Sequence, residues 1–389
     1  MVERPFTTIS QKDELVSLYF HIPFCTKKCH YCHFFVLLDK PQLHKQLIDG
    51  LKLEIAQWAD QLEGKKLASI YFGGGTPSLL EASEIHTLLE EVDRYIPYDP
   101  AKTEITLEAN PETITHEKMR AFAKAGINRI SIGVQTLDDP LLIQLGRTHR
   151  ANTSINTVKI TADAGITNIS IDLMYDIPGQ TMKSWMNTLE QIGPLPITHL
   201  SLYNLTIEPN TVFFKYRESL NKILPDAECS ADMYKTAVTM LKDCGLEQYE
   251  ISAFARDGLH SQHNTGYWTG RPFLGFGPSA FSYWDNKRFR SVAQFKRYLE
   301  ALQDGKSPID FSEELEPNKR RNELLAIALR LRSGVDCESF EAEHGRLDPE
   351  THLALQSLVD QDLLYKNGNR FSLTDHGVLF YDTIAVEII

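Results

Sequence analysis

The fold of this chain is decided by residues 25–32, CTKKCHYC, which place three of its six cysteines in the spacing C-x3-C-x2-C. Three thiolates this close can converge on one metal centre, whereas they can form at most one disulfide. Iron–sulfur clusters are held by cysteine thiolates, normally four of them. Three cysteines would leave one iron of a [4Fe–4S] cluster open to a small molecule. We therefore predict a [4Fe–4S] cluster on Cys25, Cys29 and Cys32.

Two other uses of these cysteines stay open from the spacing alone. A zinc site takes four nitrogen or sulfur ligands, commonly with a first pair spaced C-x2-4-C, and His30 or His33 would complete it. A structural disulfide with one leftover thiol is the second alternative. It is the weaker one, because disulfides belong to oxidising compartments and the chain shows no other mark of secretion.

Length and composition indicate a globular protein with one large domain and a smaller one. The chain has 389 residues, of which 42% are hydrophobic and 24% charged, as in ordinary soluble proteins. No stretch approaches the roughly 18 consecutive apolar residues of a membrane helix, and residues 1–6, MVERPF, lack the apolar core of a signal peptide. The net charge of −12 argues against a nucleic-acid partner, which would require a basic face. We expect a cytoplasmic protein with at most peripheral membrane contact.

Six apolar segments alternate with helical patterns along the first half of the chain. The predicted strands are residues 16–20, 68–72, 104–108, 128–134, 168–173 and 198–203. The predicted helices are residues 41–63, 81–94, 115–125, 138–146 and 181–192. This alternation is typical of stacked βαβ units around a parallel sheet, and right-handed connections curl such a sheet into a full or partial barrel. A doubly wound open sheet is the alternative.

Polar residues follow successive predicted strands at the point where each one ends. They are Cys25, residues 73–76, Glu108, Gln135 and Asp172. In parallel α/β folds this edge of the sheet binds ligands. Buried carboxylates are costly unless they are paired, so we expect Glu108 and Asp172 to contact a ligand.

The alternation loosens beyond residue 203, and a charged linker near residue 313 leads into a different pattern. Residues 319–332 and 350–363 are predicted helices, and residues 370–374 form a predicted strand before a further helix. This order is typical of a small winged-helix-like module. We therefore expect a core barrel over residues 1–210, a barrel extension over 211–307 and a winged-helix-like domain over 308–389.

Taken together, these motifs resemble the radical S-adenosylmethionine (SAM) superfamily. More narrowly, the chain resembles the branch that contains oxygen-independent coproporphyrinogen III oxidases and HemW-type heme chaperones. The resemblance implies a partial (β/α)6 barrel in which Cys25, Cys29 and Cys32 hold the cluster. It also implies that the amino and carboxylate groups of SAM chelate the fourth iron.

The resemblance also implies a set of SAM-binding residues. Glycines in residues 73–77, GGGTP, match the turn that holds the amino-acid end of SAM, where backbone N–H groups can approach an anion closely. Arg147 could pair with the SAM carboxylate through a two-pronged contact. The full set of matching positions is Tyr19, Tyr31, Gly74, Gly75, Thr76, Glu108, Gln135, Arg147 and Asp172.

Two features distinguish the members of this branch. The oxidases carry a further cysteine two positions after the third ligand, where this chain has Phe34. Residues 263–268, HNTGYW, form an intact H-N-x-x-Y-W, the motif linked to heme binding in HemW-type proteins. Imidazole is a standard axial ligand of heme iron and aromatic rings offer flat apolar surface. The expected heme contacts are His263, Asn264, Tyr267 and Trp268.

The resemblance therefore predicts a heme chaperone that uses a cluster and SAM and delivers heme to apo-hemoproteins, such as membrane respiratory proteins. An electron donor would be a further partner, and the protein would be a monomer or a dimer. An oxygen-independent coproporphyrinogen III oxidase is the alternative, in which the cofactor carries the chemistry. A radical SAM enzyme with another substrate is the third possibility.

Overall fold

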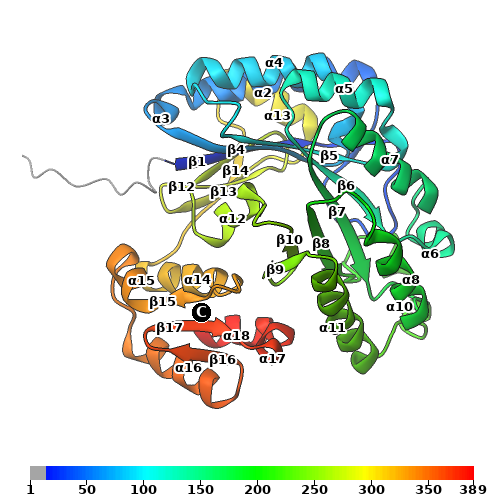
Figure 1. Ribbon diagram of the computed structural model, residues 1–389. Coiled ribbons are helices and arrows are strands. Elements are labelled where there is room, and N and C mark those ends of the chain that lie inside the picture. The colour runs from blue at the N-terminus through cyan, green and yellow to red at the C-terminus, as the bar shows by residue number, and fades with distance from the viewer. Residues whose placement is uncertain (1–14) are drawn as a thin grey trace, which may run out of the picture.

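The computed structural model describes residues 15–389, so residues 1–14, where we expected no signal peptide, lie outside the described part. The core is a run of neighbouring parallel strands whose first and last members stand at opposite sides of a curved sheet (Figure 1). In spatial order they are β1 (Leu15–Ile22), β4 (Lys66–Gly74), β5 (Glu104–Ala109), β6 (Arg129–Gln135), β7 (Asn168–Tyr175) and β8 (His199–Asn204). All six strands coincide with predicted strands to within two residues at each end, which confirms the predicted parallel sheet.

The connecting helices cover the convex side of this sheet (Figure 1). They are α2 (Pro41–Gln57), α3 (Ala59–Leu62), α4 (Ala82–Tyr95), α5 (His116–Ala125), α6 (Asp139–Gln144), α7 (Ala151–Asp163), α8 (Met182–Ile192) and α11 (Ala227–Asp243). Helices on one side and an enclosed interior on the other define a partial barrel, in place of a doubly wound sheet. Helix α7 was not predicted, because its buried face includes threonines and a serine beside Val158 and Ile160 and so lacks a continuous apolar stripe.

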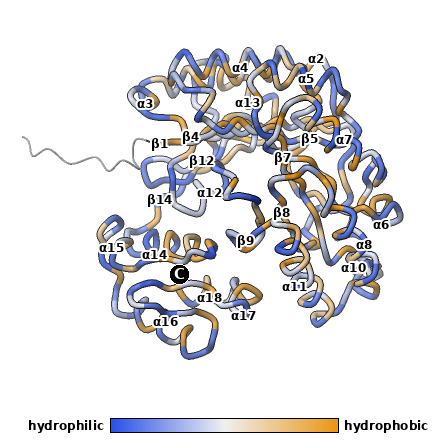
Figure 2. Tube along the Cα trace, viewed as in Figure 1, coloured by the Kyte–Doolittle hydropathy of each residue, from blue (hydrophilic) through white to orange (hydrophobic). Residues whose placement is uncertain are grey.

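The two faces of the barrel strands differ sharply in polarity. On the convex face Phe20, Phe72 and Leu107 are fully buried beneath the helices, and the Phe20 and Phe72 rings stack with centroids 5.0 Å apart. Hydrophobic positions (orange in Figure 2) run through these strands. On the concave face the register places Ser17 beside Ser69. The alternation with period two therefore separates an apolar outer core from a polar interior.

Further strands extend the same sheet on both sides, giving twelve in the described residues. Beyond β8 lie β10 (Ala253–Ala255) and β9 (Glu247–Glu250), both antiparallel to their neighbours. Beyond β1 lie parallel β11 (Phe273–Phe276) and then antiparallel β12 (Phe281–Trp284), β13 (Lys287–Ser291) and β14 (Ile309–Glu314). Helix α13 (Phe295–Gln303) packs on α2. The expected boundaries at residues 210 and 307 stay predictions.

A short helix, α12 (Gln262–Trp268), enters the barrel at the end where the parallel strands begin. Its first turn is held by Glu104, the first residue of β5, whose carboxylate accepts the N–H groups of Gln262 and His263 at 3.0 Å each. Arg129, the first residue of β6, lies 3.8 Å from the same carboxylate. Helix α12 therefore closes the barrel opposite the ligand-binding edge.

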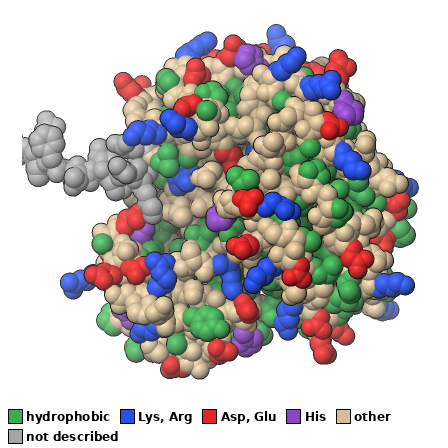
Figure 3. Space-filling model, in the orientation of Figure 1, with side chains coloured by type: hydrophobic (Ala, Val, Ile, Leu, Met, Phe, Trp, Pro, Cys, Tyr) green, Lys and Arg blue, Asp and Glu red, His purple; other side chains and the backbone are tan. Residues whose placement is uncertain are grey.

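The C-terminal part is a small helical domain with a three-stranded sheet, separate from the barrel strands (Figure 1). Its helices are α14 (Pro317–Ala328), α15 (Cys337–His344), α16 (Pro349–Asp360), α17 (Asp375–Leu379) and α18 (Tyr381–Ile388). Its strands are β15 (Val335–Asp336), β16 (Leu364–Asn367) and β17 (Arg370–Leu373). Acidic and basic side chains are interspersed over the face in Figure 3. Among residues 15–389 no helix is long and apolar enough to cross a membrane.

Candidate functional site

A cavity of ≈ 390 Å³ opens at the edge where the parallel strands end. It is lined by eleven of the predicted site residues, namely Cys25, Cys29, Tyr31, Cys32, Gly74, Gly75, Thr76, Glu108, Gln135, Arg147 and Asp172. The carboxyl ends of parallel strands meet at one edge, which is why residues from the cysteine loop, four strand ends and the loop at Arg147 converge here. Tyr19 and residues 263–268 lie elsewhere and are described below.

The cysteine loop is tied to the barrel by backbone hydrogen bonds on both sides. Strand β2 (Phe24–Cys25) pairs with β3 (Leu37–Leu38), and the Asp39 N–H donates to the Cys25 carbonyl at 2.9 Å. The His30 N–H donates to the carbonyl of Leu145 at 3.0 Å. These bonds hold the three thiols at one wall of the cavity.

The donor set at this wall, three cysteine thiols, is of the type that holds an iron–sulfur cluster. Among residues 15–389 no group of three or more His, Cys, Asp and Glu side chains converges on one metal-ion position. In a cluster each thiolate binds a different iron, so the sulfur atoms stand further apart than around one zinc. Burial raises the pKa of the Cys25 thiol to about 11, so this residue needs a metal to be held as thiolate.

The two histidines of the zinc alternative differ in position. His30 turns its ring toward α6, where Nδ1 lies 2.8 Å from the carbonyl oxygen of Gln144, and it contributes nothing to the cavity wall. His33 lines the cavity together with Phe34. His30 therefore anchors the loop, a role that the sequence pattern did not indicate.

The glycine turn lies directly under the cysteine loop. A Cβ atom at Gly75 would come within 2.6 Å of the Phe24 carbonyl oxygen, and one at Gly74 within 2.5 Å of the His21 ring. Gly74 also has φ of 106°, a conformation that side chains disfavour. Glycine is thus required at both positions for the turn to approach the loop. The N–H groups of the turn donate within the protein, from Gly75 to the Ile22 carbonyl at 2.9 Å and from Thr76 to the Phe24 carbonyl at 2.7 Å.

Glu108 connects the glycine turn to the barrel interior. Its carboxylate accepts the Gly74 N–H at 3.0 Å and the Tyr71 hydroxyl at 2.8 Å. Burial and the negative charge of Asp172 raise the pKa of Glu108 to about 7. Tyr19 lies below, with its ring 6.1 Å from that of Tyr71. Tyr19 is therefore placed to support this wall from beneath, outside the cavity lining.

Asp172 and Gln135 occupy the neighbouring strand ends. Asp172 accepts a hydrogen bond of 3.2 Å from the Ser131 hydroxyl, and burial raises the pKa of its carboxyl to about 6. Gln135 has φ of 68° at the end of β6. A non-glycine residue in this region costs on the order of 1–3 kcal/mol and such strain clusters at functional sites. Both side chains face the cavity.

Arg147 is the most extensively bonded polar residue of the site. One guanidinium nitrogen, Nη2, donates to Asn110 Oδ1 at 2.6 Å and to the Gly133 carbonyl at 2.9 Å. The other, Nη1, contacts the sulfur of Cys29 at 3.4 Å. Its Nε is buried without a hydrogen-bond partner among the described residues. A carboxylate in the cavity would satisfy that donor, so the residues present fit a ligand with an amino-acid group.

The structure adds residues that sequence reasoning missed. Asn110 joins Arg147 to Thr76, to which it donates at 3.0 Å, and Thr76 in turn donates to the sulfur of Cys25 at 3.5 Å. Further lining residues are Ser131, Gly133, Met174, Tyr203 and Asn204. Asn110 follows Glu108 at the same strand end, so its position carried a signal, whereas Tyr203 could not be told from a packing residue.

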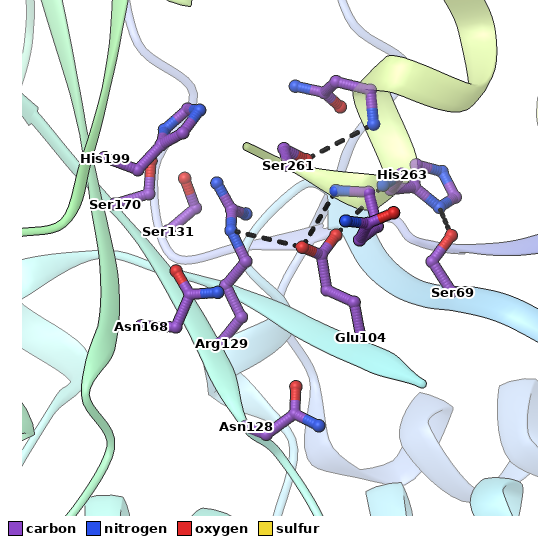
Figure 4. A network of polar contacts seen from close by, with 12 residues as sticks. Ser69, Glu104, Asn128, Arg129, Ser131, Asn168, Ser170, His199, Ser261 and His263 are labelled. Carbon is purple, nitrogen blue, oxygen red and sulfur yellow. Dashed lines mark hydrogen bonds and ion pairs between the residues drawn. The ribbon is translucent and has the colours of Figure 1, made fainter. Parts of the chain in front are cut away.

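The H-N-x-x-Y-W segment lies at the other end of the barrel, on α12 (Figure 4). His263 is 1% exposed, and its Nδ1 lies 2.9 Å from the Ser69 hydroxyl. Its Nε2 lies 2.8 Å from the hydroxyl of Tyr267. Burial and the nearby Arg271 and Arg129 charges lower the pKa of His263 to about 3, so the imidazole is neutral. Both ring nitrogens are engaged inside the protein.

The last residue of α12 points out of the barrel. The Trp268 ring faces the C-terminal domain, where the Arg330 guanidinium carbon lies 4.3 Å from its centroid. Asn264 is half-buried on the same helix, and its backbone N–H donates to Ser261 Oγ at 3.3 Å. His263 and Trp268 therefore do not line one common surface.

Comparison with known proteins identifies the superfamily. The model of the radical SAM superfamily matches residues 19–192, and that of the HemN C-terminal domain matches residues 315–380. The solved structure of coproporphyrinogen III oxidase (HemN) from Escherichia coli, a radical SAM enzyme, superposes with a TM-score of 0.85 over 97% of this chain and 90% of that chain. Its sequence identity is 22%, so the likeness shows the fold alone. The fold is that of a radical SAM protein.

Curated relatives narrow the family. The chain is 32% identical to the heme chaperone HemW of Bacillus subtilis over 93% of this chain and 96% of that protein. It is 35% identical to HemW of Lactococcus lactis over 93% of this chain and 94% of that protein. It is 31% identical to HemW of Escherichia coli over 95% of this chain and 97% of that protein. The chain belongs to the HemW family of the radical SAM superfamily.

Proposed function

We propose that this protein is a heme chaperone, which binds heme and delivers it to apo-hemoproteins with the help of a [4Fe–4S] cluster and SAM. The observation that carries the proposal is Phe34. It stands where the porphyrinogen oxidases have a further cysteine, and it is 54% exposed at the rim of the cavity. The names of the three curated relatives described above, each a heme chaperone, support the same function.

The cavity supports a division of roles among its residues. In this proposal Cys25, Cys29 and Cys32 hold the cluster, and the glycine turn with Arg147 binds the amino-acid end of SAM. The acidic residues of the interior, Glu108 and Asp172, hold the rest of that ligand, whose sulfonium is positively charged. The bound cluster and SAM would supply electron-transfer chemistry, while the chain's own residues bind and orient.

The partners follow from the same proposal. Heme is the cargo and apo-hemoproteins are its recipients. Among these recipients we propose membrane respiratory proteins, and an electron donor would be a further partner. The protein would act from the cytoplasm, peripherally at a membrane where the recipient requires it, as a monomer or a dimer. The acidic net charge of −12 disfavours nucleic acid as a partner.

The competing function is that of an oxygen-independent coproporphyrinogen III oxidase. The HemN fold favours it, but a likeness of fold does not carry an activity. The oxidase would decarboxylate two propionate side chains of its substrate, and that requires a second SAM or an equivalent acceptor. A radical SAM enzyme acting on another substrate is the third candidate.

One experiment separates these functions. Anaerobically reconstituted protein is incubated with SAM, reductant and coproporphyrinogen III, and a parallel sample is titrated with hemin. The proposal predicts saturable hemin binding and no protoporphyrinogen. Protoporphyrinogen formation would instead establish the oxidase, and the absence of both results would favour another substrate.

A further inference from the structure

The segment that carries the three cysteines is basic, although the chain as a whole is acidic with a net charge of −12. Residues 25–45 contain four lysines and a single acidic residue, namely Lys27, Lys28, Lys40, Lys45 and Asp39. The acidic residue is already engaged, because Asp39 Oδ1 lies 2.7 Å from Nε2 of His44. The positive charge of this segment therefore remains available to a partner.

Two of these lysines, Lys27 and Lys28, lie between the first two cluster cysteines at the mouth of the large cavity. Both side chains are exposed, and both line the cavity together with Cys25 and Cys29. The Lys28 ammonium donates to the Phe34 carbonyl at 3.2 Å, which holds it across the loop. Within the described part of the chain neither lysine is paired with a carboxylate. Clustered charges of one sign attract and steer a partner of the opposite sign.

An exposed apolar surface adjoins these charges. Phe34 is 54% exposed and Leu38 is 64% exposed. Leu38 is the register partner of Cys25 in the pair of β2 and β3, and Phe34 lines the cavity beside Lys28. Exposed apolar side chains with a polar rim are the usual anatomy of a protein-binding surface. We call Lys27, Lys28, Phe34 and Leu38 the loop face.

The loop face is the outer boundary of the cluster site. The three cysteines are partly exposed, and Thr26 between them is exposed. A [4Fe–4S] cluster on these thiols would lie directly behind the loop face. Electron transfer between proteins requires a close approach of the two redox groups. A partner docked on the convex side of the sheet would be kept away from the cluster by the helices that cover that side (Figure 1).

We propose that the loop face is the docking surface for an acidic one-electron carrier protein. The inference rests on the proposed heme-chaperone function and identifies the kind of electron donor that its cluster takes. The carrier, a reduced flavin or iron–sulfur protein, loses one electron and the cluster gains it, and no bond forms or breaks. The lysines steer the carrier, and Phe34 and Leu38 provide the apolar contact.

The position of the loop face favours a protein over a lipid surface. Lysines beside exposed apolar side chains would also suit an anionic membrane. Here, however, the lysines stand on the rim of a cavity of ≈ 390 Å³. A flat bilayer resting on that rim would close the entrance through which SAM must pass. A small carrier with a weak, transient interface can bind and leave again.

The test measures docking and reduction separately, with an acidic flavodoxin as the probe. Binding to the full-length, cluster-reconstituted protein is measured by calorimetry, and we expect an affinity that falls as salt is added. Lys27→Glu combined with Lys28→Glu should weaken binding about tenfold or more. The same variant should slow the loss of the cluster's visible absorption when reduced flavodoxin is added. Photoreduction by deazaflavin, which requires no docking, should proceed as in the wild type.

Two further variants separate the charge of the loop face from its apolar part. The matched control is Lys159→Glu, the same change at an exposed lysine of α7, which should bind flavodoxin as the wild type does. Phe34→Ser should weaken binding while its dependence on salt persists, because the lysines remain. A basic cytochrome c of similar size should show no binding at the loop face.

The inference is overturned if the double lysine variant binds flavodoxin and accepts its electrons as the wild type does. It is also overturned if the wild type binds no flavodoxin. If that protein instead sediments with phosphatidylglycerol vesicles through the same lysines, the loop face is a membrane surface. These results are distinct from failure of the proposed function, in which the wild-type protein itself would bind no hemin.

Discussion

Arg147 lies against the cysteine loop, with its Nη1 3.4 Å from the sulfur of Cys29. The same side chain donates to Asn110, and Asn110 reaches Thr76 beside Cys25. A positively charged group in contact with one thiol, and connected through amide and hydroxyl groups to another, stabilises thiolates. In the proposed assignment, the cluster and the carboxylate of SAM would therefore share one positively charged residue, Arg147.

Replacing Arg147 with lysine should separate these two roles. Lysine keeps the charge but loses the planar fork that can bond Asn110 and a carboxylate at once. We expect Arg147→Lys protein to accept a cluster and to bind SAM about tenfold more weakly, as measured by equilibrium dialysis. Arg150→Lys, a surface change three residues away, is the control. Equal SAM affinity in both variants would remove Arg147 from the SAM site.

The cluster assignment can be checked by counting iron. Cys29→Ala protein should fail to reconstitute the [4Fe–4S] cluster, because two thiolates cannot hold it in place of three. Iron and sulfide analysis with the visible absorption spectrum provides the measurement. Cys229→Ala, a cysteine on α11 away from the cavity, should load as the wild type does. Full iron content in the Cys29 variant would show that other ligands hold the metal.

The buried acids of the cavity predict a pH dependence. The pKa values of Glu108 and Asp172, about 7 and about 6, lie above those of unfolded chains. Between about pH 4 and 7 the folded protein therefore binds more protons, and the free energy of unfolding falls as the pH rises. The sulfonium cation of SAM stabilises the ionised carboxylates. The rise in melting temperature with SAM should thus be larger at pH 8 than at pH 6.

In Glu108→Gln protein, the rise in melting temperature caused by SAM should differ less between pH 6 and pH 8. The control is Glu54→Gln, because Glu54 is also buried with a pKa raised to about 7, yet its partners are Gly277, Ser291 and Tyr298, away from the cavity. Glu54→Gln should alter the pH dependence of the melting temperature measured without SAM. It should leave the rise in melting temperature caused by SAM unchanged. An identical SAM increment at both pH values in the wild type would contradict this account of the acids.

Glu104 should be critical for stability although it lies far from the cavity. It accepts two N–H groups of α12 and pairs with buried Arg129. Glu104→Ala leaves a buried arginine uncompensated and also removes the acceptor of the two α12 N–H groups, which together cost about 3–5 kcal/mol, as urea unfolding would show. Glu104→Gln keeps the acceptor oxygen and should cost less. Comparable losses in the two variants would indicate that the charge pairing with Arg129, and not the bonds to α12, carries the effect.

The sequence predicted the barrel well because its signals are local. Alternating apolar residues such as Ile130 and Ile132 mark strands, and the polar residues after them mark the ligand-binding edge. The placement of α12 was not predictable in this way. It depends on Glu104 and Arg129, each of which resembles an ordinary polar strand residue in the sequence, and on pairing across about 160 residues of chain.

The same limit applies within the site. The spacing of Cys25, Cys29 and Cys32 predicts their role from the sequence. The role of Asn110 follows only from its contacts with Arg147 and Thr76. The histidine of H-N-x-x-Y-W was predicted as a heme contact from the motif, and the motif does not show how deeply that histidine is buried. That prediction stays open, but the structure places Trp268, and not His263, at a cavity.

The most direct test of the central proposal is heme transfer from the reconstituted, hemin-loaded protein to an apo-b-type hemoprotein, followed by the Soret band of the acceptor. A chaperone that delivers its cargo by contact predicts a transfer rate that rises with acceptor concentration. A rate independent of acceptor concentration would show that heme merely dissociates into solution, and it would contradict delivery by this protein.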